Sequence, residues 1–169
     1  MRGLFYTQFC SPIATLWLLG DERGLLRLKI GGTEGDFLNE VELLYGSSPR
    51  ASEEIFALPL RELESYFKGW GRVFTTPLVL KGTPFQLRVW NVVKAIPFGT
   101  VLSYKEVSRR AGSPRGARAV GMAMRANPLP IFIPCHRVVR EDGTLGGFSA
   151  GEELKRWLLR LEGVGRWAD

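Results

Sequence analysis

The segment Pro134-Cys135-His136-Arg137 brings together the residue types that nucleophilic catalysis by a thiol requires. The chain has two cysteines, and His136 is its single histidine. A thiolate is the reactive form of cysteine, and a neighbouring imidazole or guanidinium favours it. A depressed pKa of Cys135 is therefore expected, although a cysteine beside the apolar run 131–133 is also typical of an inert core residue. Because side chains alternate along extended backbone, direct contact between Cys135 and His136 requires a turn or a bridging water.

The small number of thiol and imidazole groups limits other chemistries. Cys10, Cys135 and His136 cannot assemble a four-ligand structural zinc site, so no metal is expected. Two scattered cysteines make no disulfide framework, and thiols inside cells are usually reduced. Both cysteines are therefore expected to be free, with Cys10 as a core thiol.

Composition places the chain among globular proteins. It has 169 residues, of which 45% are hydrophobic and 24% charged. This excludes a disordered chain and a membrane-spanning helix. The opening residues MRGLFYTQFC contain no apolar signal-peptide core, so a cytoplasmic location is expected. Residues 1–82 carry nine basic and ten acidic side chains, whereas residues 83–169 carry fourteen and seven. The second half is thus expected to meet a polyanion such as nucleic acid, unless the charge is only a solvated basic face.

Residues 1–69 predict an N-terminal α/β domain, a small antiparallel sheet with helices. Strand-forming runs occur at 4–9, 13–19 and 25–30, separated by turn residues. Two helical stripes follow, Phe37-Val41-Leu44-Tyr45 and Leu60-Leu63-Phe67, with Pro59 starting or kinking the second helix. Residues 70–82 lose this periodicity and are interpreted as a connecting segment.

Residues 83–169 predict a mainly helical C-terminal domain with clear capping signals. Thr83 and Pro84 open a helix that ends before Pro97. The sequence Ser103-Tyr104-Lys105-Glu106 is a capping box that begins a short helix ending at 111–112. Ser113 is expected to cap another helix that runs to Asn127. The helices that begin at Ser103 and Ser113 form a candidate helix-turn-helix.

The second helix of this pair is amphipathic with a basic face. Val120 and Met124 point to one side, whereas the outward side carries Arg115, Arg118, Met122 and Arg125. The small residues Ala119 and Gly121 beside Arg118 would let the helix approach a groove wall. An ordinary surface helix with solvated arginines is the alternative.

Several runs together closely resemble the O6-alkylguanine-DNA alkyltransferase family, also called methylated-DNA–protein-cysteine methyltransferases. They are IPFGTVLSYKEV, SPRGARAVGMAMRANPLPIFIPCHRVV, DGTLGGFSAG and KRWLLRLEG, which span residues 96–163. The resemblance implies a ribonuclease-H-like α/β domain at the N-terminus and a winged-helix-like domain with a helix-turn-helix at the C-terminus. Two departures stand out, since Phe148 replaces the usual tyrosine and Ala150 the usual glycine. Phe148 keeps an aromatic wall but removes a hydroxyl, which bears on the preference for bulky alkyl groups.

The resemblance implies DNA repair by direct reversal. Cys135 would attack the alkyl carbon on O6 of guanine and keep the alkyl group as a thioether, so one protein is consumed per lesion and no cofactor is needed. His136 would act as a base toward Cys135 through a water, and Glu162 would orient His136. Glu162 lies on the flank of a predicted buried stripe, Leu154-Trp157-Leu158-Leu161, in the last helix.

The remaining implied site residues surround the guanine or bind the DNA. Tyr104 would meet the guanine ring, Asn127 would tie the recognition helix to the Cys135 loop, and Arg118 would fill the gap left by the extruded base. Pro134, Val138, Phe148 and Ser149 would line the pocket, and Arg115, Ala117, Ala119, Gly121 and Arg125 would face the minor groove. The implied partner is double-stranded DNA with a flipped O6-alkylguanine, bound by a monomer with no membrane contact.

Three other functions are compared with alkyl transfer. A damage sensor of the alkyltransferase-like type binds the lesion without repairing it, but those relatives lack the cysteine. A helix-turn-helix regulator would read the major groove as a dimer, whereas a flipping enzyme can act as a monomer. A cysteine hydrolase would need an oxyanion hole, and no motif order of known cysteine proteases is present.

Overall fold

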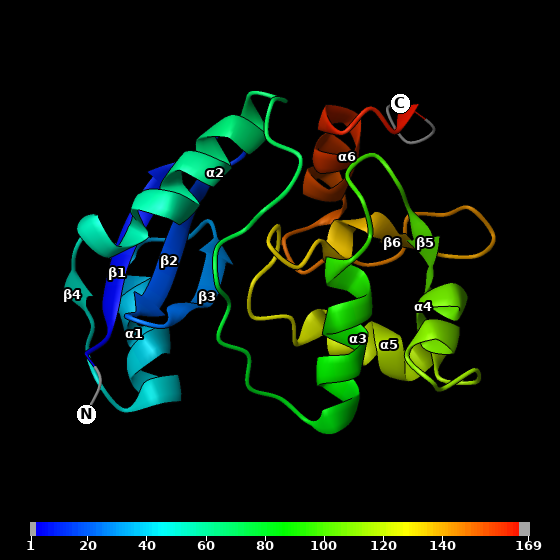
Figure 1. The fold of residues 1–169 in the computed structure, drawn as a ribbon, viewed down its shortest axis with the longest axis horizontal. Helices are drawn as coiled ribbons and strands as arrows, with labels where there is room; N and C mark the ends of the chain where they lie inside the picture. The colour runs from blue at the N-terminus through cyan, green and yellow to red at the C-terminus, as the bar shows by residue number, and fades with distance from the viewer. Residues whose placement is uncertain (1–2, 166–169) are drawn as a thin grey trace. The chain divides into compact units, whose positions relative to one another are not determined.

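A computed structural model describes residues 3–165 of the chain, which divides into two compact units between Val79 and Leu80 (Figure 1). The first unit contains a four-stranded sheet with helices, and the second is mainly helical with one pair of short strands. This combination confirms the predicted α+β class. The connecting segment 70–82 stays a prediction. Within the described range, no helix has the length and apolar character needed to cross a membrane.

The sheet of the first unit has the strand order β3-β2-β1-β4. Its strands are β1 (Phe5–Cys10), β2 (Thr15–Asp21), β3 (Gly24–Ile30) and β4 (Arg50–Ala51). The pairs β1–β2 and β2–β3 are antiparallel as predicted. The two-residue β4, which the sequence did not predict, pairs parallel to β1 at the edge of the sheet. Strand β2 is buried from Leu16 onward, which is the pattern of a central strand covered on both faces.

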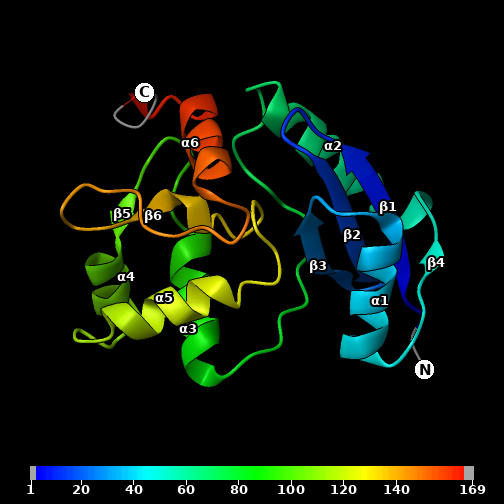
Figure 2. The same ribbon diagram turned by 180° about the vertical axis from the view of Figure 1, so that it is seen from behind.

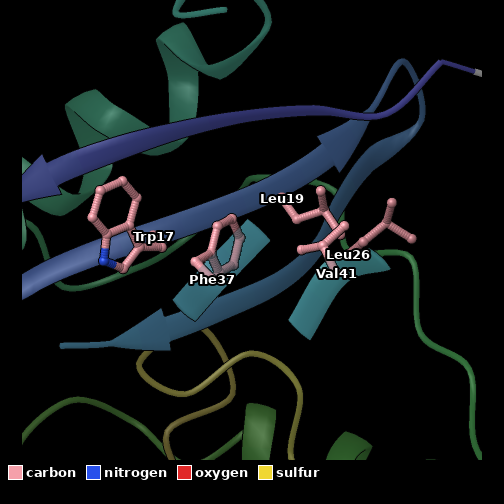
Figure 3. Close-up of a cluster of buried hydrophobic side chains, with 5 residues drawn as sticks. All are labelled: Trp17, Leu19, Leu26, Phe37 and Val41. Carbon is pink, nitrogen blue, oxygen red and sulfur yellow. The ribbon is translucent and has the colours of Figure 1, made fainter. Parts of the chain in front are cut away.

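Helix α1 (Glu34–Tyr45) covers one face of this sheet, and α2 (Ala57–Phe67) covers the other (Figures 1 and 2). Phe37 and Val41 of α1 pack on side chains of β2 and β3, which include Trp17 (Figure 3). Leu44 is 56% exposed, although its spacing placed it on the buried stripe. At this end of α1 the neighbouring Tyr45 packs on the cluster instead.

Helix α2 follows a short 3-10 turn, η1 (Glu54–Phe56), and Pro59 occupies its first turn, where proline is tolerated. Its fully buried residues are Pro59, Leu63 and Tyr66, whereas Leu60 and Phe67 of the predicted stripe are half-buried. Phe67 is half-buried and stacks on Phe9 with ring centroids 6.0 Å apart.

Cys10 does not belong to the core. It ends strand β1 and its side chain is exposed, so the prediction of a core thiol is wrong. Both cysteines are free thiols, as expected.

The second unit is built from α3 (Pro84–Lys94), α4 (Tyr104–Arg110), α5 (Ala117–Arg125) and α6 (Glu152–Leu161), with strands β5 (Leu102–Ser103) and β6 (Val138–Val139) and the 3-10 turn η2 (Cys135–Arg137). Thr83 caps α3, as the sequence predicts, and Gln86 completes a capping box that was not predicted. Ser103 caps α4 by accepting a hydrogen bond from the Glu106 backbone. The Glu106 carboxylate binds Arg109 and Arg110 instead of closing the predicted box.

Helix α5 begins later than predicted. Ser113 and Pro114 lie in a turn, and the helix starts at Ala117 after Gly116. The Ser108 hydroxyl explains the difference, because it donates to the Ser113 carbonyl and accepts from the Gly116 amide, which holds these residues in the turn. Arg115 therefore lies in the turn and not on the helix face. Helices α4 and α5 pack on one another and both contact α3, as in a helix-turn-helix domain (Figure 1).

One side-chain hydrogen bond anchors α5 to α3. The buried indole of Trp90 in α3 donates from Nε1 to the Ala123 carbonyl of α5 at 2.9 Å. Since α5 carries the basic face, this bond fixes the position of the basic face relative to α3.

Trp90→Phe is expected to lower the free energy of unfolding by about 1–3 kcal/mol, because the Ala123 carbonyl loses its buried donor. Urea unfolding followed by circular dichroism measures the change. Trp70→Phe is the matched control, since Trp70 is 74% exposed and should change stability by no more than about 0.5 kcal/mol. Equal losses in the two variants would contradict this role of Trp90.

Candidate active site

The pairing of β5 with β6 brings together two segments that are far apart in the chain. The strands are parallel, with Leu102 opposite Val138 and Ser103 opposite Val139. Tyr104 follows β5 directly, and the turn that holds Cys135 directly precedes β6. The sequence-predicted residues Tyr104 and Cys135 therefore meet at one place.

A cavity of about 460 Å³ lies between them. This volume falls in the range of roughly 300–1,000 Å³ that is usual for small-molecule sites. Its lining residues are Tyr104, Gly121, Met124, Arg125, Cys135, Arg140, Gly147, Phe148 and Ser149. Cys135 is only 6% exposed, and it lines this cavity. The cavity thus offers a thiol to a ligand of nucleobase size.

Some lining residues escaped the sequence analysis. Met124, Arg140 and Gly147 line the cavity without having been predicted to do so. The predicted pocket residues Pro134 and Val138 are buried but are not part of the lining. Val138 instead uses its carbonyl to accept a hydrogen bond from Lys155 at 2.7 Å.

The loop that follows β6 packs closely on Tyr104. A Cβ atom at Gly146 would lie 2.8 Å from the Tyr104 ring, and the backbone at Gly146 has a φ of +75°. Both features require glycine there. The Tyr104 hydroxyl lies 3.5 Å from the Gly147 carbonyl oxygen, so the phenol stays at the cavity wall.

Asn127 connects the end of α5 to the turn that carries Cys135. Its amide nitrogen donates to the Ile133 carbonyl and its amide oxygen accepts from the Leu129 backbone, both at 2.9 Å. Between these contacts, the buried Ile131 adopts a φ of +76°, an unfavourable conformation for a β-branched residue. This conformation persists because the surrounding contacts over-determine the segment.

The Glu162 carboxylate gathers three partners in the interior. His136 Nε2 lies 2.6 Å from Oε2, Arg137 binds both oxygens at 2.7 and 3.0 Å, and the Gly99 backbone donates to Oε1 at 3.1 Å. Arg137 also donates to the Ile96 carbonyl at 2.7 Å. The carboxylate therefore joins the end of α6, the Cys135 turn and the loop after α3.

These contacts determine the protonation states. Burial alone would raise the pKa of Glu162, but the hydrogen bonds and charges of His136 and Arg137 outweigh it and hold this pKa below the ordinary value. Burial lowers the pKa of His136, against the opposing effect of Glu162. A neutral imidazole facing a carboxylate must place its proton on Nε2. The other ring nitrogen, Nδ1, can then act as a base.

The predicted depressed pKa of Cys135 is wrong for the resting protein. Burial raises the pKa of this thiol, and the hydrogen bond from Asn127 and the charge of Lys155 offset the effect only in part. The guanidinium of Arg137, which was expected to help, is turned toward Glu162. The thiol is therefore protonated at neutral pH and needs a base in order to react.

Lys155 belongs to the surroundings of Cys135, although the sequence did not predict it there. Its ammonium is fully buried and donates to the carbonyls of Val138, Leu145 and Gly147 at 2.7, 2.6 and 3.1 Å. Burial lowers its pKa to about 8, so it is largely charged at neutral pH. That charge acts on Cys135, and the three bonds hold the cavity loop.

The position of Lys155 also corrects the predicted stripe of the last helix. The buried residues of α6 are Lys155, Leu158 and Leu159, whereas Leu154, Trp157 and Leu161 are half-buried. The spacing of Lys155, Leu158, Leu159 and Glu162 is i, i+3, i+4, i+7, which would have identified this face had lysine been counted as a core residue.

A second cavity of about 550 Å³ lies along the basic face of α5. Arg118 and Met122 line it together with Ala117, and Met122 is 69% exposed. The predicted contact residues Arg115 and Ala119 are exposed but are not part of this lining.

In residues 3–165, no three His, Cys, Asp or Glu side chains gather in a way that could hold a metal ion. The groups that are present can support nucleophilic attack by one thiol, with an imidazole as base and a buried carboxylate that orients it.

Family models match both units of the chain. The model described as "6-O-methylguanine DNA methyltransferase, DNA binding domain" matches residues 84–164, and the one described as its "ribonuclease-like domain" matches residues 4–80. The second match agrees with the predicted N-terminal domain.

Individual proteins are similar over nearly the whole chain. A methylated-DNA–protein-cysteine methyltransferase of Methanosarcina acetivorans is 40% identical over 95% of this chain and 99% of its own. A constitutive one of Bacillus subtilis is 34% identical, over 95% and 96%. The crystal structure of Mycobacterium tuberculosis OGT in complex with DNA superposes with a TM-score of 0.84 at 34% identity, covering 98% of this chain and 99% of that one.

Glu162→Gln is expected to lower the free energy of unfolding by about 3–5 kcal/mol at neutral pH, because it leaves the buried Arg137 guanidinium uncompensated. In the wild type, the contribution of the ionised Glu162 to the free energy of unfolding is complete above the ordinary carboxyl pKa of 4.5. It is lost as the pH falls toward the lower pKa of the folded state. Denaturant unfolding at a series of pH values should therefore show a flatter acid dependence in the variant. Glu153→Gln, a change at an exposed glutamate of α6, is the control. Parallel acid limbs for Glu162→Gln and wild type would contradict the assignment.

Lys155→Met is expected to raise the pKa of Cys135, since a cation that favours the thiolate is lost. In a Cys10→Ser background, the rate of alkylation by iodoacetamide should fall by roughly tenfold at neutral pH. Lys94→Met, a change at an exposed lysine of α3, should leave the rate unchanged. Circular dichroism verifies that the helices persist, and an unaltered pH profile in Lys155→Met would count against an electrostatic role.

Proposed function

The chain belongs to the methylated-DNA–protein-cysteine methyltransferase family, and we propose that it repairs alkylated DNA by direct reversal with Cys135 as the alkyl acceptor. The observation that carries this assignment is the thiol of Cys135 on the wall of a nucleobase-sized cavity, next to an imidazole held by a buried carboxylate. Methyl transfer from methylated DNA to a protein cysteine is the activity that the names of its relatives state.

The transfer is a single displacement. Nδ1 of His136 takes the thiol proton of Cys135 through a water molecule, and the resulting thiolate attacks the alkyl carbon on O6 of the guanine. A sulfur–carbon bond forms while the carbon–oxygen bond breaks, and the electron pair of the broken bond stays on O6. A thioether has no easy leaving reaction, so each protein chain acts once.

Tyr104 supports departure of the guanine. Burial and then the charge of a Cys135 thiolate raise the pKa of its hydroxyl, so the phenol is neutral and can donate a hydrogen bond to the purine. Donation at this point offsets the negative charge that builds on the leaving base. Phe148 and Ser149 complete the wall around the base, and Asn127 keeps the Cys135 turn in place.

The DNA is bound through the basic face of α5, and the damaged base leaves the helix. A stacked guanine cannot bring its alkyl carbon in line with a buried sulfur, so the nucleotide must swing out. Arg118 fills the vacated position, and the small residues Ala117 and Gly121 allow α5 to approach the minor groove. Arg115, Ala119 and Arg125 add contacts near the backbone. One chain suffices for this reaction, so a monomer acts on each lesion.

Incubation with a duplex that carries O6-methylguanine should convert each chain to a product in which one methyl group replaces the thiol hydrogen, as measured by intact mass and peptide mapping to Cys135. Cys135→Ser should gain no mass, because an alcohol is a far weaker nucleophile. Cys10→Ser is the matched control and should react like the wild type, since Cys10 belongs to the first unit.

The same experiment separates the rival functions. Tight binding of the lesion without a mass change would indicate a damage sensor, and indifference to the lesion would indicate a regulator. Repeated turnover without a stable adduct would indicate a hydrolase.

A further inference from the structure

Two cavities of the second unit share part of their lining. The first is the cavity beside Cys135, and the second, here called the groove, is the cavity along the basic face of α5 that Arg118 lines. Both are lined by Tyr104, Gly121, Arg125 and Arg140. These four residues, here called the neck, mark the passage between the groove and the cavity. A ligand that extends from the groove to Cys135 must therefore pass between the residues of the neck.

The neck carries two positive charges from different elements. Arg125 lies in the last turn of α5. Arg140 follows β6 and starts a tight turn, in which its backbone donates to the Thr144 carbonyl at 2.9 Å and accepts from the Gly143 amide at 3.1 Å. Its guanidinium therefore projects from a well-anchored backbone, which reduces the entropy lost when it binds a ligand.

Several nearby basic residues are already engaged with carboxylates, whereas those of the neck are not. Arg109 and Arg110 bind Glu106, Arg137 binds Glu162, and Lys105 lies 3.5 Å from Glu141. Among the side chains of residues 3–165, none forms an ion pair with Arg125 or Arg140, and both arginines are exposed. The neck thus presents two guanidinium groups that are available to an external anion.

The charges of the neck are directed at the entrance of the cavity. Burial raises the pKa of Tyr104, and the charges of Arg140 and Arg125 act in the opposite direction. Arg140 also acts on the buried Lys155. Both guanidinium groups therefore lie close enough to the phenol to influence it.

We propose that Arg140, together with Arg125, binds a phosphodiester group of the extruded nucleotide at the neck and so stabilises the flipped-out state. The proposal rests on the proposed function. A flipped nucleotide places its base beside Cys135 while its phosphates remain on the groove side, so the flanking phosphate lies at the neck. Guanidinium and phosphate groups form paired, charge-assisted hydrogen bonds. In an undistorted duplex no nucleotide enters the cavity, so no phosphate is drawn to the neck. The contact therefore stabilises the extruded nucleotide and not DNA binding in general.

The test compares Arg140→Gln with wild type in single-turnover alkyl transfer. On a duplex with O6-methylguanine, the variant should react at least about tenfold more slowly, the effect of losing one hydrogen bond to a charged group. Free O6-benzylguanine has no phosphate, so the fall in rate caused by Arg140→Gln should be clearly smaller on this substrate than on the duplex. The fall that remains measures what Arg140 contributes through Tyr104 and Lys155. Arg61→Gln removes an exposed arginine of the first unit and is the charge-matched control for both substrates.

A duplex with a neutral methylphosphonate next to the lesion identifies the contact. Replacing the contacted phosphate should slow the wild type at least as much as Arg140→Gln does. The same replacement should slow the variant less than the wild type, because only the contact with Arg125 is left to lose. Additive losses at both flanking positions would overturn the proposal, as would an equal fall on the free base or an unchanged rate on the duplex. If the wild type transfers no alkyl group from either substrate, the proposed function itself fails, which is a different outcome.

Discussion

The geometry of the candidate active site depends on one buried group, the carboxylate of Glu162. An ionised carboxylate in a protein interior is costly unless it is paired and fully hydrogen-bonded. Here it receives an imidazole, a guanidinium and a backbone amide from segments that lie 25 to 63 residues away. The requirement to satisfy this one group brings the end of α6, the Cys135 turn and the loop after α3 together. The cavity beside Cys135 is a consequence of that assembly.

The same network explains why the thiol rests in its neutral form. Arg137 neutralises Glu162 and leaves Lys155 as the buried cation that acts on the sulfur, and burial of the thiol outweighs that effect. A neutral thiol in a closed interior is protected from ionisation until a base removes its proton. His136, neutral and oriented by Glu162, is well suited to be that base.

Features that depend on residues close together in the sequence were predicted correctly, whereas features that depend on distant residues were not. Thr83 and Ser103 were placed correctly because capping depends on residues three positions apart. The start of α5 was wrong because the Ser108 hydroxyl, a tertiary partner, holds Ser113 in a turn. The burial of Lys155 was missed because only the folded loop supplies the three carbonyl acceptors that make a buried ammonium tolerable. The motif around Cys135 predicted the thiol that lines the cavity, but the pKa of this thiol depends on where Arg137 points, which a motif does not specify.

The protonation of the single histidine tests this account most directly. Selective ¹⁵N labelling of histidine gives signals from His136 alone, because the chain contains no other histidine. The account predicts a neutral ring at pH 7 with the proton on Nε2, shared with Glu162, and with Nδ1 unprotonated. A proton on Nδ1, in either the other neutral tautomer or a fully protonated ring, would contradict it, because the group that must accept the thiol proton would already be occupied.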